Sequence, residues 1–166
     1  MATTAYATLT IAVKAEMTPD SPLEGIIKGD ANNGSKGQSW TNGTGSGQIG
    51  QVYRAQHTIG AAATVNFDTL AAGALADIAG DTIDLDELKW LYIEVTTGQV
   101  EFIAPATSFL DLFKATGDAI DLSANHVLCL EFGAAGLDVT TNSKFDITDI
   151  AGGSGSIVEV SFGGAK

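Results

Sequence analysis

"AIDLSANHVLCLEFGAAGLDVTTNSKFDITDIAGGSGSIVEVSFG", residues 119–163, is a series of short apolar segments separated by Gly, Asn or Ser. The segments are four to eight residues long and rich in β-branched or aromatic side chains, which is typical of strands. The separators leave room only for brief turns. This stretch predicts an all-β fold, in which short strands pack as a two-sheet sandwich or jelly roll.

The residues before this stretch continue the same pattern. Leu91, Ile93 and Val95 alternate with Trp90, Tyr92 and Glu94, and a "TTGQ" turn leads back into a second strand, so a hairpin is expected. Residues 51–60 and 63–67 are also expected to be strands. Apolar spacings near residues 70–78 and 107–113 predict two short helices. The expected fold is therefore a jelly-roll-like β-sandwich with one or two short helices.

The N-terminal part has a different character. Thr8 to Ala15 alternates as a strand does, but residues 29–50 hold seven glycines in 22 positions and almost no aliphatic side chains. We therefore expect residues 1–50 to form a strand and a glycine-rich arm, and residues 51–166 to form the sandwich domain. Trp40, the large apolar residue of the arm, either folds back on the surface of its own domain or anchors the arm on a partner subunit.

Composition and charge exclude several classes of protein. The formal net charge is −12, and residues 1–67 carry four acidic and four basic side chains, so the excess lies entirely in the later part. Such a charge disfavours nucleic acid as a partner. The sequence contains no run of 18 apolar residues and no pattern of a cleavable signal, so we expect neither membrane insertion nor export. The single cysteine, Cys129, is expected to be a buried structural thiol.

The acidic stretch "GDTIDLDELKW", residues 80–90, is the first candidate for chemistry. Asp84 and Asp86 flank Leu85, so a strand would place both on the face opposite the core. The order of oxygen donors does not fit an EF-hand, which leaves a solvated strand face, or a weak surface calcium site that includes Asp81.

No other pattern indicates a catalytic or cofactor site. His126 and Cys129, three positions apart, would lie on opposite faces of one strand and could not share a metal ion. No nucleophile elbow or phosphate-binding loop is present. We expect no enzyme activity, no catalytic residues, no metal and no cofactor.

The last hundred residues resemble a group of small virion proteins of tailed bacteriophages. The similar segments are 65–102, 108–132 and 136–164, which share with that group an aliphatic strand after a leucine and a glycine, a small helix before a Gly-Asp turn, and a glycine-punctuated C-terminal ending. The matching positions are Leu75, Gly80, Leu91, Ile93, Phe109, Leu112, Ile120, Val139, Asp146, Ile147, Gly153, Val158, Val160 and Gly163.

The resemblance implies a jelly roll on the capsid exterior, commonly a trimer, that decorates or cements the shell or forms the base of a head fibre. Its partner would be the major capsid protein, and it would reside in the host cytoplasm during assembly. A tail or baseplate component and a carbohydrate-binding sandwich are the alternatives. Residues 1–50 are expected to hold the shell, and Trp90 with Tyr92 to form an exposed apolar patch through which copies associate. The residues expected to contact a partner are Leu9, Ile11, Val13, Trp40, Trp90 and Tyr92.

Overall fold

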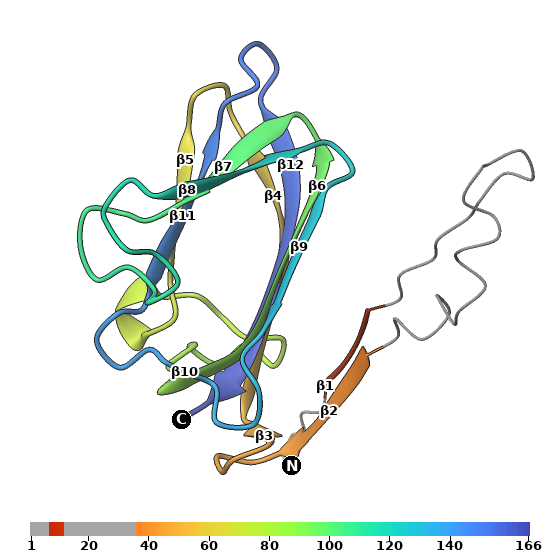
Figure 1. Cartoon of the computed structure of the whole chain (residues 1–166), viewed down its shortest axis with the longest axis vertical. Helices are drawn as coiled ribbons and strands as arrows, with labels where there is room; N and C mark the ends of the chain where they lie inside the picture. The colour runs from red at the N-terminus through yellow and green to blue at the C-terminus, as the bar shows by residue number, and fades with distance from the viewer. Residues whose placement is uncertain (1–6, 12–35) are drawn as a thin grey trace, which may run out of the picture.

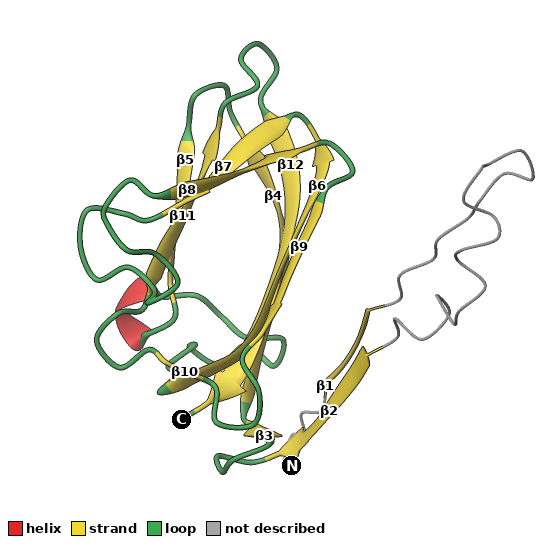
Figure 2. Cartoon of the chain, in the orientation of Figure 1, coloured by secondary structure: helices red, strands yellow, loops and turns green. Residues whose placement is uncertain are grey.

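The computed structural model of the chain describes residues 7–11 and 36–166, and nearly all of its regular structure is β (Figures 1 and 2). The strands are β1 (Ala7–Ile11), β2 (Lys36–Asn42), β3 (Gln48–Ile49), β4 (Gln51–Ile59), β5 (Thr64–Asp68), β6 (Glu87–Thr97), β7 (Gln99–Ile103), β8 (Ala119–Ser123), β9 (Val127–Glu131), β10 (Leu137–Asp138), β11 (Lys144–Asp149) and β12 (Ser156–Ala165).

Two antiparallel sheets form the sandwich. One has the order β4-β12-β6 with β9 and the short β10 both paired to the far side of β6, and the other has the order β5-β11-β7-β8. The pairs β4·β12, β5·β11, β6·β9 and β7·β8 join the first half of the chain's strands to the second half. A ribbon of paired strands therefore wraps around the core, which is the jelly-roll order. The predicted all-β sandwich is confirmed.

The core lies between the two sheets and is filled by inward residues of both. The alternating residues Leu91, Ile93 and Val95 are fully buried, as the sequence predicted. Aromatic rings span the interior: Phe67 stacks on Phe145 with ring centroids 4.7 Å apart, and other rings continue the contact toward β12. The space between the sheets is thus packed with side chains.

A bulge in β6 changes which side chains enter this core. Trp90 is paired with Gly163, whereas the next partner, Gly164, is paired with Leu88, so Lys89 is the extra residue. Without the bulge, Leu88 and Trp90 would share the outer face. With it, Leu88 is buried in the core and Trp90 stays outside.

The predicted helices are reduced to a single turn. Within residues 70–78 only a 3₁₀ turn, η2 (Ala71–Gly73), forms, and Ile78 is 67% exposed, so its spacing does not mark a buried helical face. The helix predicted at residues 107–113 is absent. Its backbone pairs with β11 instead: the N–H of Leu110 donates to the carbonyl of Lys144, and the N–H of Lys144 donates to Ser108. Tertiary pairing therefore overrides the local helical spacing.

A small third sheet contains the N-terminal strands. β1 pairs antiparallel with β2, and β2 pairs with β3 in parallel. Part of the glycine-rich stretch is thus a strand, β2. Its composition did not predict this, because the strand is held by backbone pairing with β1. Figure 1 shows β1 and β2 standing clear of the sandwich and joining it beside β3. Residues 12–15 of the predicted first strand lie outside the described residues.

One buried carboxylate gives the sandwich a predictable response to pH. Asp149 accepts hydrogen bonds from the Ser156 hydroxyl (2.5 Å) and the Ala62 N–H (3.0 Å), and these bonds lower its pKa below the ordinary value near 3.8. Stability from these bonds is present above that ordinary value and is lost as the pH falls through the lowered pKa. Asp149→Asn should therefore lower the melting temperature at pH 7, and the difference from wild type should shrink below about pH 4. Thermal melts from pH 2 to 7 test this, with Asp121→Asn as an exposed control.

Candidate interaction surface

Three of the six predicted partner-binding residues meet on one outer face of the sandwich. Trp40 from β2 and Trp90 from β6 form a second apolar cluster with Ile49 and Val52, and Tyr92 packs against it. The cluster lies over the sheet formed by β4, β12 and β6, at the place where the β1–β2 pair joins the sandwich. The sequence order gave no sign that Trp40 would reach Trp90, because the two are 50 positions apart.

The expectation that Trp90 lies in an exposed apolar patch is wrong. Its indole lies over Gly163 of β12, where an added Cβ would come within 2.7 Å of the indole nitrogen. Trp40 and Ile49 cover the other side, and Trp90 is only 8% exposed while Trp40 is 2% exposed. Trp40 thus packs on the surface of its own chain. Whether the cluster also binds a partner stays a prediction.

The cluster holds two unused hydrogen-bond donors. The indole N–H groups of Trp40 and Trp90 are buried, and neither has an acceptor among the described residues. Buried polar groups are satisfied in the great majority of cases, and an unsatisfied donor costs about 1–3 kcal/mol. Because both nitrogens are buried, an acceptor on another molecule could reach them only if the cluster opened.

A shallow cavity of about 250 Å³ adjoins the cluster on the same face. Across it, Arg54 pairs with Glu159 at 2.5 Å, and the Tyr92 hydroxyl donates to Glu94 at 2.5 Å. Burial and the Glu94 carboxylate raise the pKa of Tyr92 to about 12, so the phenol stays protonated and donates. The charges of this face are mutually paired, which suits a polar contact surface.

The strand β1 carries the remaining predicted residues. Leu9 is paired with Gln38 and Ile11 with Lys36, which fixes the register of β1 on β2. β1 is the edge strand of the small sheet, and no other strand of the described part pairs with its outer side. Val13 lies outside the described residues.

Trp40 should fasten the β1–β2 pair to the sandwich. Trp40→Ala removes the side chain that covers Trp90, so we expect a loss of about 2 kcal/mol of stability, since burying a large apolar side chain is worth about 1.5–3 kcal/mol. Intrinsic fluorescence of the remaining Trp90 should shift to longer wavelength. Trp40→Phe, which keeps most of the apolar contact, is the matched control and should shift little. An unshifted spectrum in Trp40→Ala would mean that Trp40 does not shield Trp90.

The acidic stretch takes part in local contacts. Ile83 and Leu85 are buried as predicted, although residues 83–86 form no regular strand. Asp84 accepts the Ala71 N–H at 3.2 Å and pairs with Lys166, and these bonds lower its pKa. Within residues 7–11 and 36–166 no group of three His, Cys, Asp or Glu side chains is placed to hold a metal ion.

Replacing the acidic pair should have little effect. Asp84→Asn/Asp86→Asn removes a largely exposed ion pair with Lys166, and exposed pairs of this kind contribute little. We expect a melting temperature within about 3 °C of wild type. Loss of a tightly bound metal in the double variant, measured by elemental analysis, would contradict this.

The two histidines and the cysteine take part in separate local contacts. His57 Nε2 shares a hydrogen bond with the Tyr53 hydroxyl at 2.9 Å, and burial lowers the pKa of His57. His126 Nδ1 accepts the Ser123 N–H at 3.2 Å. Cys129 is half-buried and burial raises its pKa, so the thiol form predominates at neutral pH.

Comparison with known proteins adds no assignment: no protein-family model matches the chain, and no curated protein matches it. Among the residues that the structure describes, no helix is long and apolar enough to cross a membrane.

Proposed function

We propose that the protein is a non-enzymatic structural component of a tailed-bacteriophage virion, which binds the major capsid protein and decorates or cements the outside of the shell. The observation that carries the proposal is the jelly-roll strand order combined with a strand pair, β1 and β2, that stands clear of the sandwich and keeps an open edge. A rigid body with a projecting strand suits attachment to another protein by strand addition.

The distribution of charge also supports different roles for the arm, which attaches to the shell, and for the sandwich. The net charge of −12 belongs to the residues after 67, whereas residues 1–67 balance four acidic against four basic side chains. Within the described part of the arm, residues 7–11 and 36–49, Lys36 is the only charged side chain. A neutral arm approaches an acidic protein shell without the repulsion that the sandwich itself would meet.

The resemblance of residues 65–164 to small phage virion proteins also favours this function, and it is the source of the capsid partner and of the trimer. The jelly-roll order agrees with what that resemblance implies for the fold.

Copy number in purified particles tests the proposal. A decoration protein should be present in a fixed ratio to the major capsid protein, in hundreds of copies for a shell of hundreds of subunits. Quantitative mass spectrometry of intact particles measures this ratio. A handful of copies per particle would instead identify a tail or baseplate component, and absence from particles would reject a virion role.

A further inference from the structure

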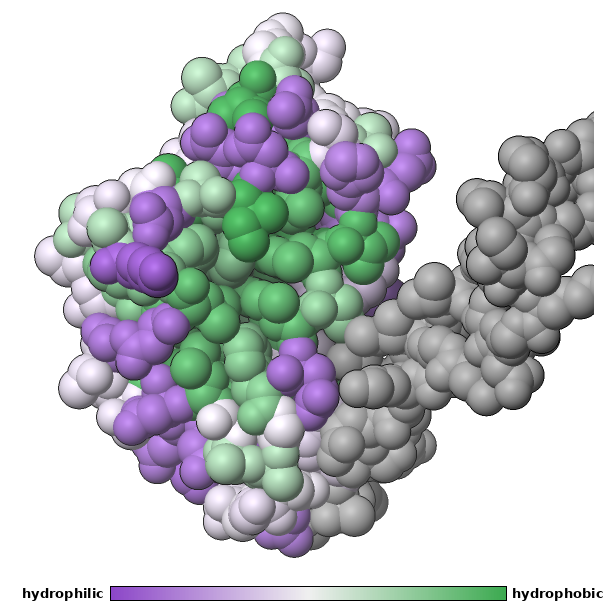
Figure 3. Space-filling view, in the orientation of Figure 1, coloured by the Kyte–Doolittle hydropathy of each residue, from purple (hydrophilic) through white to green (hydrophobic). Residues whose placement is uncertain are grey.

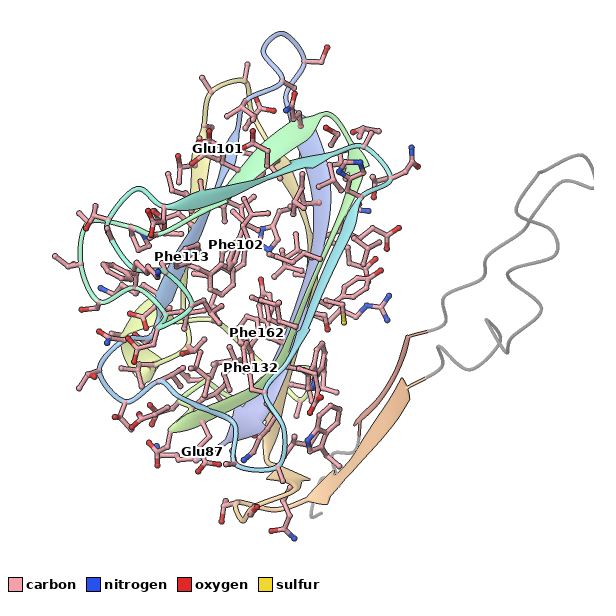
Figure 4. The ribbon with its side chains drawn as sticks, in the orientation of Figure 1. Glu87, Glu101, Phe102, Phe113, Phe132 and Phe162 are labelled. Carbon is pink, nitrogen blue, oxygen red and sulfur yellow. The ribbon has the colours of Figure 1, made fainter. Side chains whose placement is uncertain are left out.

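The open end of the sandwich between β8 and β9 presents an apolar groove. A cavity of about 420 Å³ lies here, lined mainly by apolar side chains, among them Phe102, Leu112, Phe113, Ile120 and Leu130. Figure 3 shows hydrophobic side chains gathered across the middle of this face, with hydrophilic ones around them. Figure 4 places Phe102, Phe113 and Phe132 toward the opening between the two strands.

The exposure of single residues points to the two strands that flank the groove. Three large apolar residues of the described part are exposed, and two of them lie on these strands. Ile120 (43%) on β8 lines the groove, and Val127 (52%) on β9 is paired with Glu94 on the outer face of its sheet. A contiguous apolar patch on one face of a small domain is typical of an interface. The core beneath is complete, since Phe102 and Leu122 are already buried, so the groove is additional apolar surface.

The outer backbone edge of β9, beside the groove, is also unpaired. The N–H of Phe132 donates to the backbone carbonyl of Lys89, and the N–H of Val95 donates to the backbone carbonyl of His126. The even-numbered residues of this segment therefore bond to β6. In an antiparallel ladder the intervening residues direct their N–H and C=O groups away from that partner. Val127, Cys129 and Glu131 therefore offer an open edge, and β9 pairs with no other strand of the described structure. Such an edge is a template for a further strand.

The charges around the groove decide between two ways of filling it. Asp118 and Lys114 line the groove, and Asp121 on β8 and Glu131 on β9 lie on the strands that form its rim; all four are exposed. Two grooves pressed face to face would bring these acidic rims together, which disfavours a symmetric groove-to-groove dimer. An uncharged strand would meet no such repulsion.

The chain itself contains a strand with these properties. β1 has the sequence ATLTI, which is uncharged and has apolar residues at alternate positions, and its five residues equal the length of β9. It has an open outer edge, and it stands clear of its own sandwich. Strand addition of this kind gives affinity through the backbone and specificity through alternate side chains.

We propose that the groove is an interface between copies of this chain, in which β1 of one copy pairs with the open edge of β9 in the next. The contact is head-to-tail, so it closes into a ring where the rotation between copies allows. It uses the open edge of β1, so a copy whose β1 is paired in this way would hold a capsid through another part of residues 1–50. The inference goes beyond the capsid role and holds for the free protein.

The test measures the mass of the full-length protein by light scattering between 1 and 100 µM. Leu9→Asp/Ile11→Asp disrupts the arm. Ile120→Glu/Val127→Glu disrupts the groove at Ile120 and the edge strand β9 at Val127, and both positions are exposed. Each variant should weaken association by roughly 30-fold or more, as expected for central interface residues. Ile78→Glu, the same change at the third exposed apolar residue, should associate as wild type does.

Mixing the two disrupted variants identifies the pairing. The groove variant keeps an intact arm, and the arm variant keeps an intact groove. An equimolar mixture should therefore give a complex with the mass of two chains. Val127→Pro removes the outward N–H of β9 and should abolish association, whereas Val127→Thr keeps the N–H and should preserve it. A monomeric wild type at 100 µM, undiminished association of the arm variant, or no mixed dimer would each overturn the proposal. None of these results depends on capsid binding.

Discussion

Deletion of residues 1–50 is expected to leave a soluble, cooperatively melting sandwich that no longer binds particles lacking their own copy of the protein. The main core consists entirely of residues from Tyr53 onward, so the truncated chain keeps every strand of the two large sheets. The arm supplies the neutral surface and the open strand edge on which the proposed attachment depends. The expected effect on particle binding is therefore complete loss.

The same deletion should lower stability by a smaller amount. It removes Trp40 and Ile49, which cover Trp90 and Val52, so the outer cluster becomes exposed to water. Burial of two large apolar side chains is worth about 3–6 kcal/mol when each contributes its usual 1.5–3 kcal/mol. Deletion of residues 1–35 keeps both of these side chains and is the matched control. It should melt close to wild type and still fail to bind particles.

Cosedimentation with particles and thermal melts separate the outcomes. If the chain that begins at residue 51 does not fold, the arm belongs to the folding unit and the division at residue 50 is wrong. If the chain that begins at residue 51 folds and still binds particles, the adhesive surface lies on the sandwich. Binding only by the chain that begins at residue 36 would place that surface in residues 36–50.

Sequence reasoning predicted the features that depend on local patterns. The hairpin of β6 and β7 follows from the alternation of Leu91, Ile93 and Val95 and from a turn at Gly98, and both signals lie within a few residues of their effect. The strands from β8 to β12 were recognisable for the same reason. With so many short strands and brief turns, a two-sheet sandwich is one of few ways to bury all the apolar faces.

Features that depend on distant partners were missed. The helical spacing at residues 107–113 is real, but Leu110 fills the core and bonds to Lys144, 34 positions away. Trp40 contacts Trp90 only because β2 and β3 lie against the sheet that contains β6. The apolar groove required the relative placement of β8 and β9, which belong to different sheets although they are consecutive in the chain.

Lys89 is the clearest example of a residue whose role needed the structure. In the sequence it stands within the apolar segment "LKWLYI", and lysine is almost never fully buried unless it is paired. In the structure its side chain, at the bulge of β6, is completely buried. The ammonium donates to the carbonyls of Ala134 (2.7 Å) and Ala135 (2.9 Å) and pairs with Glu87. One side chain thus holds the loop between β9 and β10 against β6.

Lys89→Ala should therefore be strongly destabilising. It removes a fully buried side chain, leaves the Ala135 carbonyl without a donor and takes one of two donors from the Ala134 carbonyl. We expect a loss of about 3–5 kcal/mol, within the range for large buried side chains truncated to Ala. For a chain of this size that corresponds to a fall of roughly 6–20 °C in melting temperature. Denaturant unfolding and thermal melts measure both quantities.

Two further variants separate the charge from the packing of the stem. Lys89→Met keeps most of the apolar stem but has no donor, so it should recover only part of the loss if the hydrogen bonds dominate. Lys144→Met removes a partly exposed lysine whose nearest carboxylate, Asp68, is 3.8 Å away, and it should cost less than about 1 kcal/mol. A Lys89→Met protein as stable as wild type would show that the ammonium adds nothing. In that case the loop between β9 and β10 would be held by its backbone contacts, such as the bond from the Gly47 N–H to Ala134.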